Sequence, residues 1–275
     1  MTHQAETLID NLLVILVLYK TQLSETAAYI SLSKSLTNSS CDLFIYDNSP
    51  KPQTCTSDVF KINYIHDCGN PGVSKAYNEG FKKAKELKKK WLLLIDQDTE
   101  FPTGALKKYE ELIAKEGAGL VIPILYDVKG IVSPLKFSMG GGQRIKYLQS
   151  QRLKLMDYYF HNSGQLISVE DFESAGGYDE SFPLDFSDFS FVHRLKNHCS
   201  HFLVADINCQ HSLASTLNSN ADERLLRFKS YVSSGKYFQE KYQPRNFFIP
   251  LRIFLRAIKL TLQYQNFSFL IAYFS

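Results

Sequence analysis

Residues 91–99 set the fold, and they read Trp91-Leu92-Leu93-Leu94-Ile95-Asp96-Gln97-Asp98-Thr99. A run that is apolar at every position is typical of a strand covered on both faces, as in the middle of a parallel sheet. Asp96 and Asp98 follow at alternate positions, so their side chains point the same way along an extended chain. Ligands of open α/β sheets bind beyond the carboxyl ends of the strands, where these two acids are expected to lie.

Two neighbouring carboxylates repel each other, and a divalent cation that prefers oxygen ligands, Mg²⁺ or Mn²⁺, relieves the repulsion. A nucleoside diphosphate would supply further oxygen ligands. The alternative is an Asp-rich turn after a core strand, with Pro102 ending the strand. Within this stretch, both interpretations remain open.

The composition places the chain among ordinary folded proteins. Its 275 residues suffice for one large α/β domain or two small ones, with 44% hydrophobic and 21% charged residues. The net charge of +3, from 31 basic and 28 acidic residues, is too small to imply a nucleic-acid partner.

The cysteines and the apolar runs indicate a cellular compartment. An odd number of scattered cysteines without a C-x-x-C pair fits free thiols in a reducing environment; they are Cys41, Cys55, Cys68, Cys199 and Cys209. No secretory signal precedes the first apolar run, and no run reaches the roughly 18 residues of a membrane span. We therefore expect a cytoplasmic protein.

Strand and helix patterns alternate through the first 125 residues. This alternation predicts βαβ units and a mainly parallel sheet. Besides residues 91–95, strands are predicted at 12–18, 43–46, 59–65 and 119–123, and helices from a cap at Ser24 to about 36, from 70–80 to about 88, and over 104–116.

Two further stretches could contact a ligand. Asp47-Asn48-Ser49-Pro50 is a turn cluster after a strand, where the acid either satisfies turn amides or binds a nucleoside's base or ribose. Gly140-Gly141-Gly142 with Arg144 could form a phosphate cradle, but the stretch lacks the strand, Lys and Ser/Thr of a P-loop. We expect a mobile loop there.

A second pair of acids lies among aromatic residues. Asp185 and Asp188 are three residues apart, so they are neighbours on one face if a helix begins here. They could serve only to cap that helix. An acid among aromatic side chains is also how a general base acquires a raised pKa.

Taken together, these motifs resemble the inverting glycosyltransferases of family two, specifically the rhamnosyltransferase-like branch that builds bacterial surface polysaccharides such as O-antigen or capsule. The resemblance covers roughly residues 12–215, and it rests on the order of motifs that are weak one by one. They are Leu18-Tyr19-Lys20, Asp47-Asn48-Ser49, Asn70-x-Gly72 with Asn78, Asp96-Gln97-Asp98, Ser163-Gly164, Gly176-Gly177-Tyr178-Asp179-Glu180, and Asp185-x-x-Asp188 with Arg194.

The resemblance implies a GT-A fold, an α/β fold with a Rossmann-like, mainly parallel sheet flanked by helices. Residues 1–220 would form this domain, with a nucleotide-sugar-binding half (1–125) and an acceptor-binding half (126–220). Residues 221–275 would form a C-terminal helical extension. The implied donor is dTDP-rhamnose or a UDP-hexose, and the implied acceptor is a saccharide or a lipid-linked oligosaccharide.

The resemblance also assigns roles to residues. Asp47 would contact the base and Asp96 the ribose or metal; the implied donor-binding set is Tyr19, Asp47, Asn48, Gly72, Asn78, Asp96 and Gln97. The implied ligands of Mg²⁺ or Mn²⁺ are Asp98, Asp96 and His211, although His211 could equally be an ordinary polar residue after a strand.

The catalytic base departs from the family pattern. Many relatives carry a Glu-Asp pair whose second member is the base, and Phe186 stands at that position here. The base is then Asp185 or Asp188. We favour Asp188, since Asp185 could instead hold the acceptor or orient the loop.

Other functions compete with this interpretation. A nucleotidyltransferase would also place metal-binding acids after a parallel strand, but it would need a basic, Gly-rich loop that Tyr19-Lys20-Thr21 is not. A sugar-nucleotide-binding module would need neither Asp98 nor the second acid pair. Within the family, transfer of galactofuranose or another hexose rivals transfer of rhamnose.

The C-terminal segment has the pattern of a helix that lies in a membrane surface. On a helix over residues 251–264, the basic residues Arg252, Arg256 and Lys259 share one face opposite a broad apolar one. We therefore expect this segment to bind the cytoplasmic membrane surface. The alternative is a terminal helix packed on the core or on a partner subunit.

Overall fold

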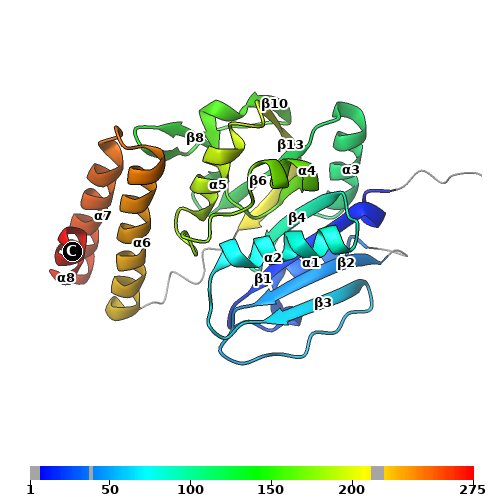
Figure 1. Cartoon of the computed structure of the whole chain (residues 1–275), viewed down its shortest axis with the longest axis horizontal. Helices are drawn as coiled ribbons and strands as arrows, with labels where there is room; N and C mark the ends of the chain where they lie inside the picture. The colour runs from blue at the N-terminus through cyan, green and yellow to red at the C-terminus, as the bar shows by residue number, and fades with distance from the viewer. Residues whose placement is uncertain (1–6, 37–39, 212–219) are drawn as a thin grey trace, which may run out of the picture.

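The computed structural model describes residues 7–36, 40–211 and 220–275 (Figure 1). Its centre is a ten-stranded sheet whose main path has the order β10-β13-β6-β12-β4-β1-β2-β3. The strands are β1 (Leu12–Leu18), β2 (Cys41–Asp47), β3 (Phe60–His66), β4 (Trp91–Asp96), β5 (Thr99–Glu100), β6 (Leu120–Asp127), β7 (Gly130–Ser133), β10 (Gln151–Lys154), β12 (Gln165–Ser168) and β13 (His201–His211).

Four strands of the N-terminal part run parallel, in the order β4-β1-β2-β3. β1 and β4 lie in the middle of the sheet, and this explains why their sequences are apolar almost throughout. All seven residues of β1 are buried, whereas in the edge strand β3 only Phe60 is buried and the other positions are partly or fully exposed. The expected parallel sheet is therefore confirmed, and the carboxyl ends of β1, β2 and β4 meet at one edge.

The sheet continues across residue 125 and becomes mixed. β12 lies antiparallel between β4 and β6, and β13 runs parallel to β6. A separate small sheet has the order β11-β8-β9 and consists of β8 (Leu135–Ser138), β9 (Gly141–Gln143) and β11 (Tyr158–Tyr159). The two predicted halves of the domain therefore share one sheet.

Helices cover both faces of the main sheet, because successive strand residues point to opposite sides. Leu12, Val14 and Leu16 pack towards α1 (Ala27–Ser33) and α3 (Ala105–Glu116). Leu13 and Ile15 pack in the other core, with α2 (Val73–Glu86), α4 (Val169–Ser174) and α5 (Ser187–Leu195). These cores hold the strand ends, and hence the site, in fixed positions.

Three sequence-based predictions need local correction. Helix α1 is capped by Thr26, whose side chain accepts a hydrogen bond from the Tyr29 amide, because a 3₁₀ turn occupies Leu23–Glu25 where Ser24 was expected to cap. Gly141 and Gly142 pair with β8 rather than forming a mobile loop, and Arg144 binds Asp127. Helix α5 begins at Ser187, so Asp185 lies in the preceding loop and shares no helix face with Asp188.

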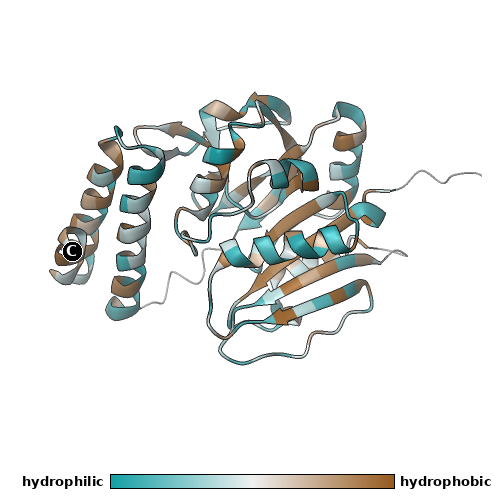
Figure 2. Ribbon diagram, viewed as in Figure 1, coloured by the Kyte–Doolittle hydropathy of each residue, from teal (hydrophilic) through white to brown (hydrophobic). Residues whose placement is uncertain are grey.

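The C-terminal helices form a layer of their own at the left of Figure 1. They are α6 (Ala221–Tyr242), α7 (Phe248–Tyr264) and α8 (Ser268–Phe274), which contact one another and build a third core around Phe228, Ile253 and Phe269. Figure 2 shows apolar residues along these helices. No helix in the described ranges combines the length and the apolar character that crossing a bilayer requires.

Candidate active site

A cleft of about 800 Å³ lies at the carboxyl ends of β1 and β4, between the sheet and the C-terminal helices. Both predicted acid pairs line it, Asp96 with Asp98 and Asp185 with Asp188. The fold thus brings together two pairs that are about 90 residues apart in the sequence. One cavity therefore contains both the predicted metal-binding acids and the predicted general base.

Asp96, Asp98 and His211 form a group that could hold a metal ion. One ligand atom from each residue lies within 4.8 Å of the other two. Two carboxylate oxygens and one imidazole nitrogen suit Mn²⁺ or Mg²⁺ with a diphosphate completing the coordination. His211 is the last residue of β13. β13 pairs with β5, and this pairing brings His211 next to the end of β4. The side chains present therefore fit a divalent cation.

The electrostatics of Asp98 agree with such a site. Burial, followed by repulsion from Asp96, raises the pKa of Asp98 to about 6, although nearby His211 acts in the opposite direction. A bound cation would offset both causes of the rise, because its positive charge stabilises the ionised carboxylates and compensates their mutual repulsion. The Asp96 and Asp98 carboxylates therefore favour the binding of a positive charge.

A chain of hydroxyl groups orients the imidazole. Ser163 Oγ donates to Thr99 Oγ1 at 2.7 Å, and Thr99 Oγ1 lies 2.8 Å from His211 Nδ1. Thr99 Oγ1 accepts a hydrogen bond from Nδ1 when that nitrogen carries the proton and donates one to it when it does not, so the plane of the ring is fixed in either tautomer. Ser163 also accepts a hydrogen bond from the Asp96 amide at 2.9 Å. Ser163 of the Ser163-Gly164 motif therefore positions two residues of the candidate metal site, His211 through Thr99 and Asp96 directly.

Asp96 is fixed by a buried tyrosine. Tyr77 Oη donates to Asp96 Oδ1 at 2.8 Å, and Tyr77 lies in α2 with no exposed surface. Burial, together with the charge of Asp96, raises the pKa of Tyr77 far above its ordinary value, so the phenol keeps its proton and acts only as a donor. One oxygen of Asp96 remains for a ligand.

Gln97 organises the loop after β1. Its Oε1 accepts from the Tyr19 amide at 2.8 Å, and its Nε2 donates to the Tyr19 carbonyl and to Thr21 Oγ1. Tyr19, with an exposed ring, lines the cleft next to Gln97. The two predicted donor-binding residues are therefore in contact, and Gln97 positions Tyr19.

Asp47 and Asn48 are buried at the end of β2. Asp47 accepts hydrogen bonds from the Ser49 amide, Tyr64 Oη and Gln53 Nε2. Burial alone would raise its pKa, but these hydrogen bonds outweigh burial and hold the pKa below its ordinary value. Asp47 has no exposed surface, so it organises this turn; its predicted contact with the base stays a prediction.

Gly72 and Asn78 join the start of α2 to the segment that carries the second acid pair. Gly72 has φ of +94°, and any side chain there would overlap the Pro183 backbone. Asn78 accepts from the Tyr178 amide at 2.7 Å and donates to the Tyr178 carbonyl and to Glu180. Both contacts position the loop before α5. A direct contact of either residue with the donor stays a prediction.

Asp188 lies in the first turn of α5, and only 15% of its side chain is exposed. Its Oδ2 is 2.9 Å from His161 Nδ1. Burial alone would lower the pKa of His161, but the hydrogen bond and the charge of Asp188 more than offset it, and the pKa is raised. His161 also stacks on His211, with ring centroids 6.4 Å apart. It thus lies between the two acid groups.

Asp185 is engaged differently from Asp188. Arg227 of α6 binds both of its oxygens, with Nε at 2.9 Å from Oδ2 and Nη2 at 3.2 Å from Oδ1. Phe186 has φ of +64°, and its ring packs against Tyr231 and Phe238 of α6. The loop before α5 is therefore tied to the C-terminal helices at two consecutive residues.

Several residues that lie in or directly behind this cleft were not predicted from the sequence to lie there. His161 directly precedes the Asn162-Ser163-Gly164 motif, and that position is the one signal that could have pointed to it. Tyr77 reads as an ordinary core residue of a helix. Arg227, Arg252 and Arg256 line the cleft from helices whose sequences carry no ligand motif.

With this geometry established, sequence comparison gives the family. The profile of Glycosyl transferase family 2 matches residues 32–172, and this chain belongs to that family. The chain is also similar to the dTDP-rhamnosyl transferase RfbF of Shigella flexneri, with 24% identity over 209 residues that cover 74% of this chain and 70% of the relative. The protein is a glycosyltransferase of the rhamnosyltransferase-like kind.

Solved structures agree on the fold. TarS (residues 1–349) of S. aureus superposes with a TM-score of 0.55 at 13% identity, over 95% of this chain and 80% of TarS. GalNAc-T7, solved with UDP, GalNAc and Mn²⁺, gives a TM-score of 0.57 at 13% identity, over 95% of this chain and 55% of that one. The expected GT-A-like architecture with C-terminal helices is confirmed.

Proposed function

We propose that this enzyme transfers a sugar, most specifically rhamnose, from a nucleoside diphosphate donor to a saccharide or lipid-linked acceptor, with inversion, in bacterial surface-polysaccharide synthesis. The observation that carries the proposal is the cleft in which Asp96, Asp98 and His211 face the Asp188–His161 pair. One group suits a metal-bound diphosphate and the other suits proton removal. The similarity to a dTDP-rhamnosyl transferase supports the choice of sugar.

The donor diphosphate is assigned to the Asp96–Asp98–His211 group. A divalent cation bound there would neutralise the diphosphate and make it a better leaving group. Tyr19 and the loop that Gln97 fixes lie next to these acids and are placed to contact the nucleoside. GalNAc-T7 was solved with UDP and Mn²⁺, and TarS with UDP-GlcNAc. These complexes favour a UDP-hexose as the alternative donor.

Asp188 is assigned as the general base. Its carboxylate takes the proton of the acceptor hydroxyl while that oxygen attacks the anomeric carbon and the bond to the diphosphate oxygen breaks. The electron pair leaves with the nucleoside diphosphate, and attack from the opposite face inverts the anomeric centre. His161 holds Asp188 in place. Asp185 is the weaker candidate, because both of its oxygens already bind Arg227.

Association with the inner face of the cell membrane is also part of this proposal. The C-terminal helices expose large apolar side chains, each more than half exposed: Leu255, Leu262, Phe267, Ile271 and Phe274. The sequence pattern placed the basic residues of α7 at the membrane surface, but Arg252 and Arg256 line the cleft instead. The apolar side chains, with exposed Lys259 nearby, are thus what the helices offer to a lipid surface.

Thermal denaturation with a panel of sugar nucleotides tests the proposed function. A donor at 100 times its dissociation constant should add about 2.7 kcal/mol of stability when Mn²⁺ or Mg²⁺ is present. We expect dTDP-rhamnose to give the largest effect, and EDTA or Asp98→Ala to abolish it. If no sugar nucleotide stabilises the protein with either metal, the proposed function is wrong.

A further inference from the structure

Two arginines of α7 face the cleft without a partner of opposite charge. Arg252 and Arg256 both line it, and neither forms an ion pair or a hydrogen bond to a carboxylate within residues 7–36, 40–211 and 220–275. They are four residues apart on one helix, so their charges repel. Residues 248–275 contain three basic and no acidic residues. An anion in the cleft would relieve this repulsion.

Residues of α6 and of the glycine stretch contact the two arginines. The guanidinium of Arg256 lies over the ring of Tyr231, 4.0 Å from the centroid. Arg252 lies over the backbone of Gly141, where any side chain would overlap its Nη1. Gly140 allows the same close approach to the first turn of α7, because a Cβ there would lie 2.9 Å from the Ile249 nitrogen. The glycine stretch thus makes room for α7 and for Arg252.

The carboxylates of the cleft are already committed. Asp185 binds Arg227, Asp188 binds His161, and Asp96 with Asp98 belongs to the metal group. A planar guanidinium suits phosphate oxygens, which it binds through two parallel hydrogen bonds. A phosphate brought by a ligand is therefore the natural partner of Arg252 and Arg256.

Contacts connect the arginines to the acceptor side of the cleft. Arg256 stacks on Tyr231, and Tyr231 packs against Phe186 with centroids 5.3 Å apart. In the sequence, Phe186 lies between the two acids of the second pair. The metal group, by contrast, is built from the ends of β4 and β13. This placement favours a phosphate of the acceptor over the diphosphate of the donor.

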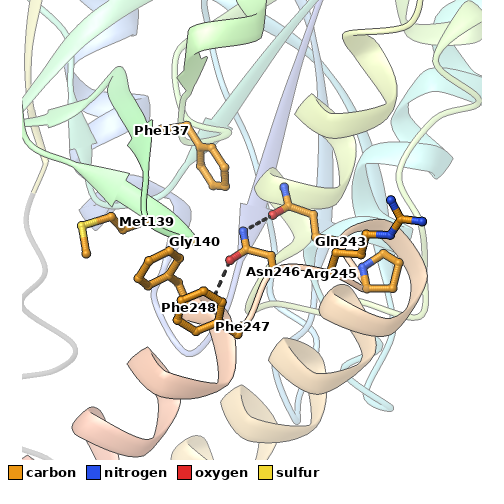
Figure 3. Close-up of a pocket in the computed structure, with 9 residues that line it drawn as sticks. Phe137, Met139, Gly140, Gln243, Arg245, Asn246, Phe247 and Phe248 are labelled. Carbon is orange, nitrogen blue, oxygen red and sulfur yellow. Dashed lines mark hydrogen bonds between the residues drawn. The ribbon is translucent and has the colours of Figure 1, made fainter.

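A second cavity adjoins this end of the cleft, since Gly140 lines both. It has a volume of about 560 Å³ and lies at the turn between α6 and α7 (Figure 3). The aromatic and apolar side chains of Phe137, Met139, Phe247 and Phe248 surround it. Asn246 fixes the turn by bonding to Gln243 and to the Phe248 amide. An apolar group attached to the phosphate would fit here.

We propose that Arg252 and Arg256 form an anion subsite for a phosphate ester of the acceptor, whose apolar part occupies the cavity of Phe137, Met139, Phe247 and Phe248. The proposal rests on the proposed function, in which Asp188 activates that acceptor. It assigns the positive face of α7 to substrate binding. The subsite works without metal, which separates it from the donor site.

Calorimetric titration of the full chain with geranyl phosphate in EDTA tests the subsite. We expect geranyl phosphate to bind, and Arg252→Gln with Arg256→Gln to weaken the binding at least tenfold. Lys229→Gln is the matched control, because it removes a charge from an exposed position of the neighbouring helix α6, outside both cavities, and should change the affinity less than twofold. Phe247→Ser should weaken geranyl phosphate while leaving inorganic phosphate unchanged.

Titration with UDP and Mn²⁺ separates the two sources of phosphate. The double arginine variant should bind UDP–Mn²⁺ within twofold of the wild type. If the variant no longer binds UDP, the arginines serve the donor and the proposal is wrong. Equal binding of geranyl phosphate to the wild type and to the variant would also overturn the proposal. Circular dichroism checks the fold, and Arg252→Gln alone replaces the double variant if that one unfolds. Failure of both UDP–Mn²⁺ and dTDP–Mn²⁺ to bind the wild type would count against the proposed function only.

Discussion

Replacing Asp98 by Asn should stabilise the metal-free protein while it abolishes transfer. The carboxylate has a pKa of about 6 in the folded state, compared with an ordinary value of 3.8. Between these pH values the folded protein binds a proton that the unfolded chain has released. Stability therefore falls as the pH rises from 4 to 6, and the full cost is present above pH 6. Asn carries no charge and escapes that cost.

The structure sets the size of this effect. The difference between 3.8 and about 6 corresponds to about 3 kcal/mol. A third of the Asp98 side chain is exposed (33%), so water screens part of the repulsion and we expect about 1–2 kcal/mol. For a chain of this size, that gain raises the melting temperature by roughly 2–8 °C.

Urea denaturation in EDTA at pH 8 and at pH 4 measures the effect. The gain of Asp98→Asn should be present at pH 8 and absent at pH 4, where Asp98 is protonated in the folded wild type. Asp206→Asn is the control, because Asp206 is exposed and pairs with Lys108 at 3.4 Å. With Mn²⁺ and donor, the wild type should gain stability and the variant should not. A variant less stable than the wild type at pH 8 in EDTA would refute the reasoning.

Three further outcomes follow from the same contacts. Asp188→Asn should lower kcat more than a hundredfold with unchanged affinity for the donor, whereas Asp185→Asn should act mainly by loosening Arg227. If both variants turn over within tenfold of the wild type, a difference of about 1.4 kcal/mol in the activation barrier, the base is another residue. Gly72→Ala should lower the free energy of unfolding, measured in urea, by about 2–4 kcal/mol, because a Cβ at a φ of +94° overlaps Pro183. Gly104→Ala is the control and should lower it less, because the space around Gly104 is open. Leu262→Ser with Phe267→Ser and Ile271→Ser should reduce co-sedimentation with anionic lipid vesicles, and equal pelleting of variant and wild type would contradict the membrane proposal.

The strands and their polar ends could be predicted from the sequence. Leu12–Leu18 is buried at every position as expected, and the predicted strand before Asp96 forms the centre of the sheet. These features are local, because burial on both faces demands an unbroken apolar run and a carboxylate ends that run. The ordered motifs then gave the family, which the sequence profile confirmed.

The partners of each acid could not be predicted in the same way. His211 reaches Thr99 across 112 residues, Arg227 reaches Asp185 across 42, and His161 reaches Asp188 across 27. No periodicity connects such positions, since the contacts depend on β13 pairing with β5 and on α6 packing beside α5. The candidate metal ligands and the candidate base could be named from the sequence, but the residues that position them could not.

The helix α7 shows where local pattern stops and tertiary packing begins. Its sequence specifies an amphipathic helix with Arg252 and Arg256 on one face, and that pattern fits a membrane surface as well as a cleft. The direction of the face depends on the packing of α7 against Gly140, more than a hundred residues earlier, where a Cβ would meet the backbone of the first turn of the helix. Amino-acid order therefore determined which residues share a face, and close packing between distant segments decided that Arg252 and Arg256 on this face line the cleft.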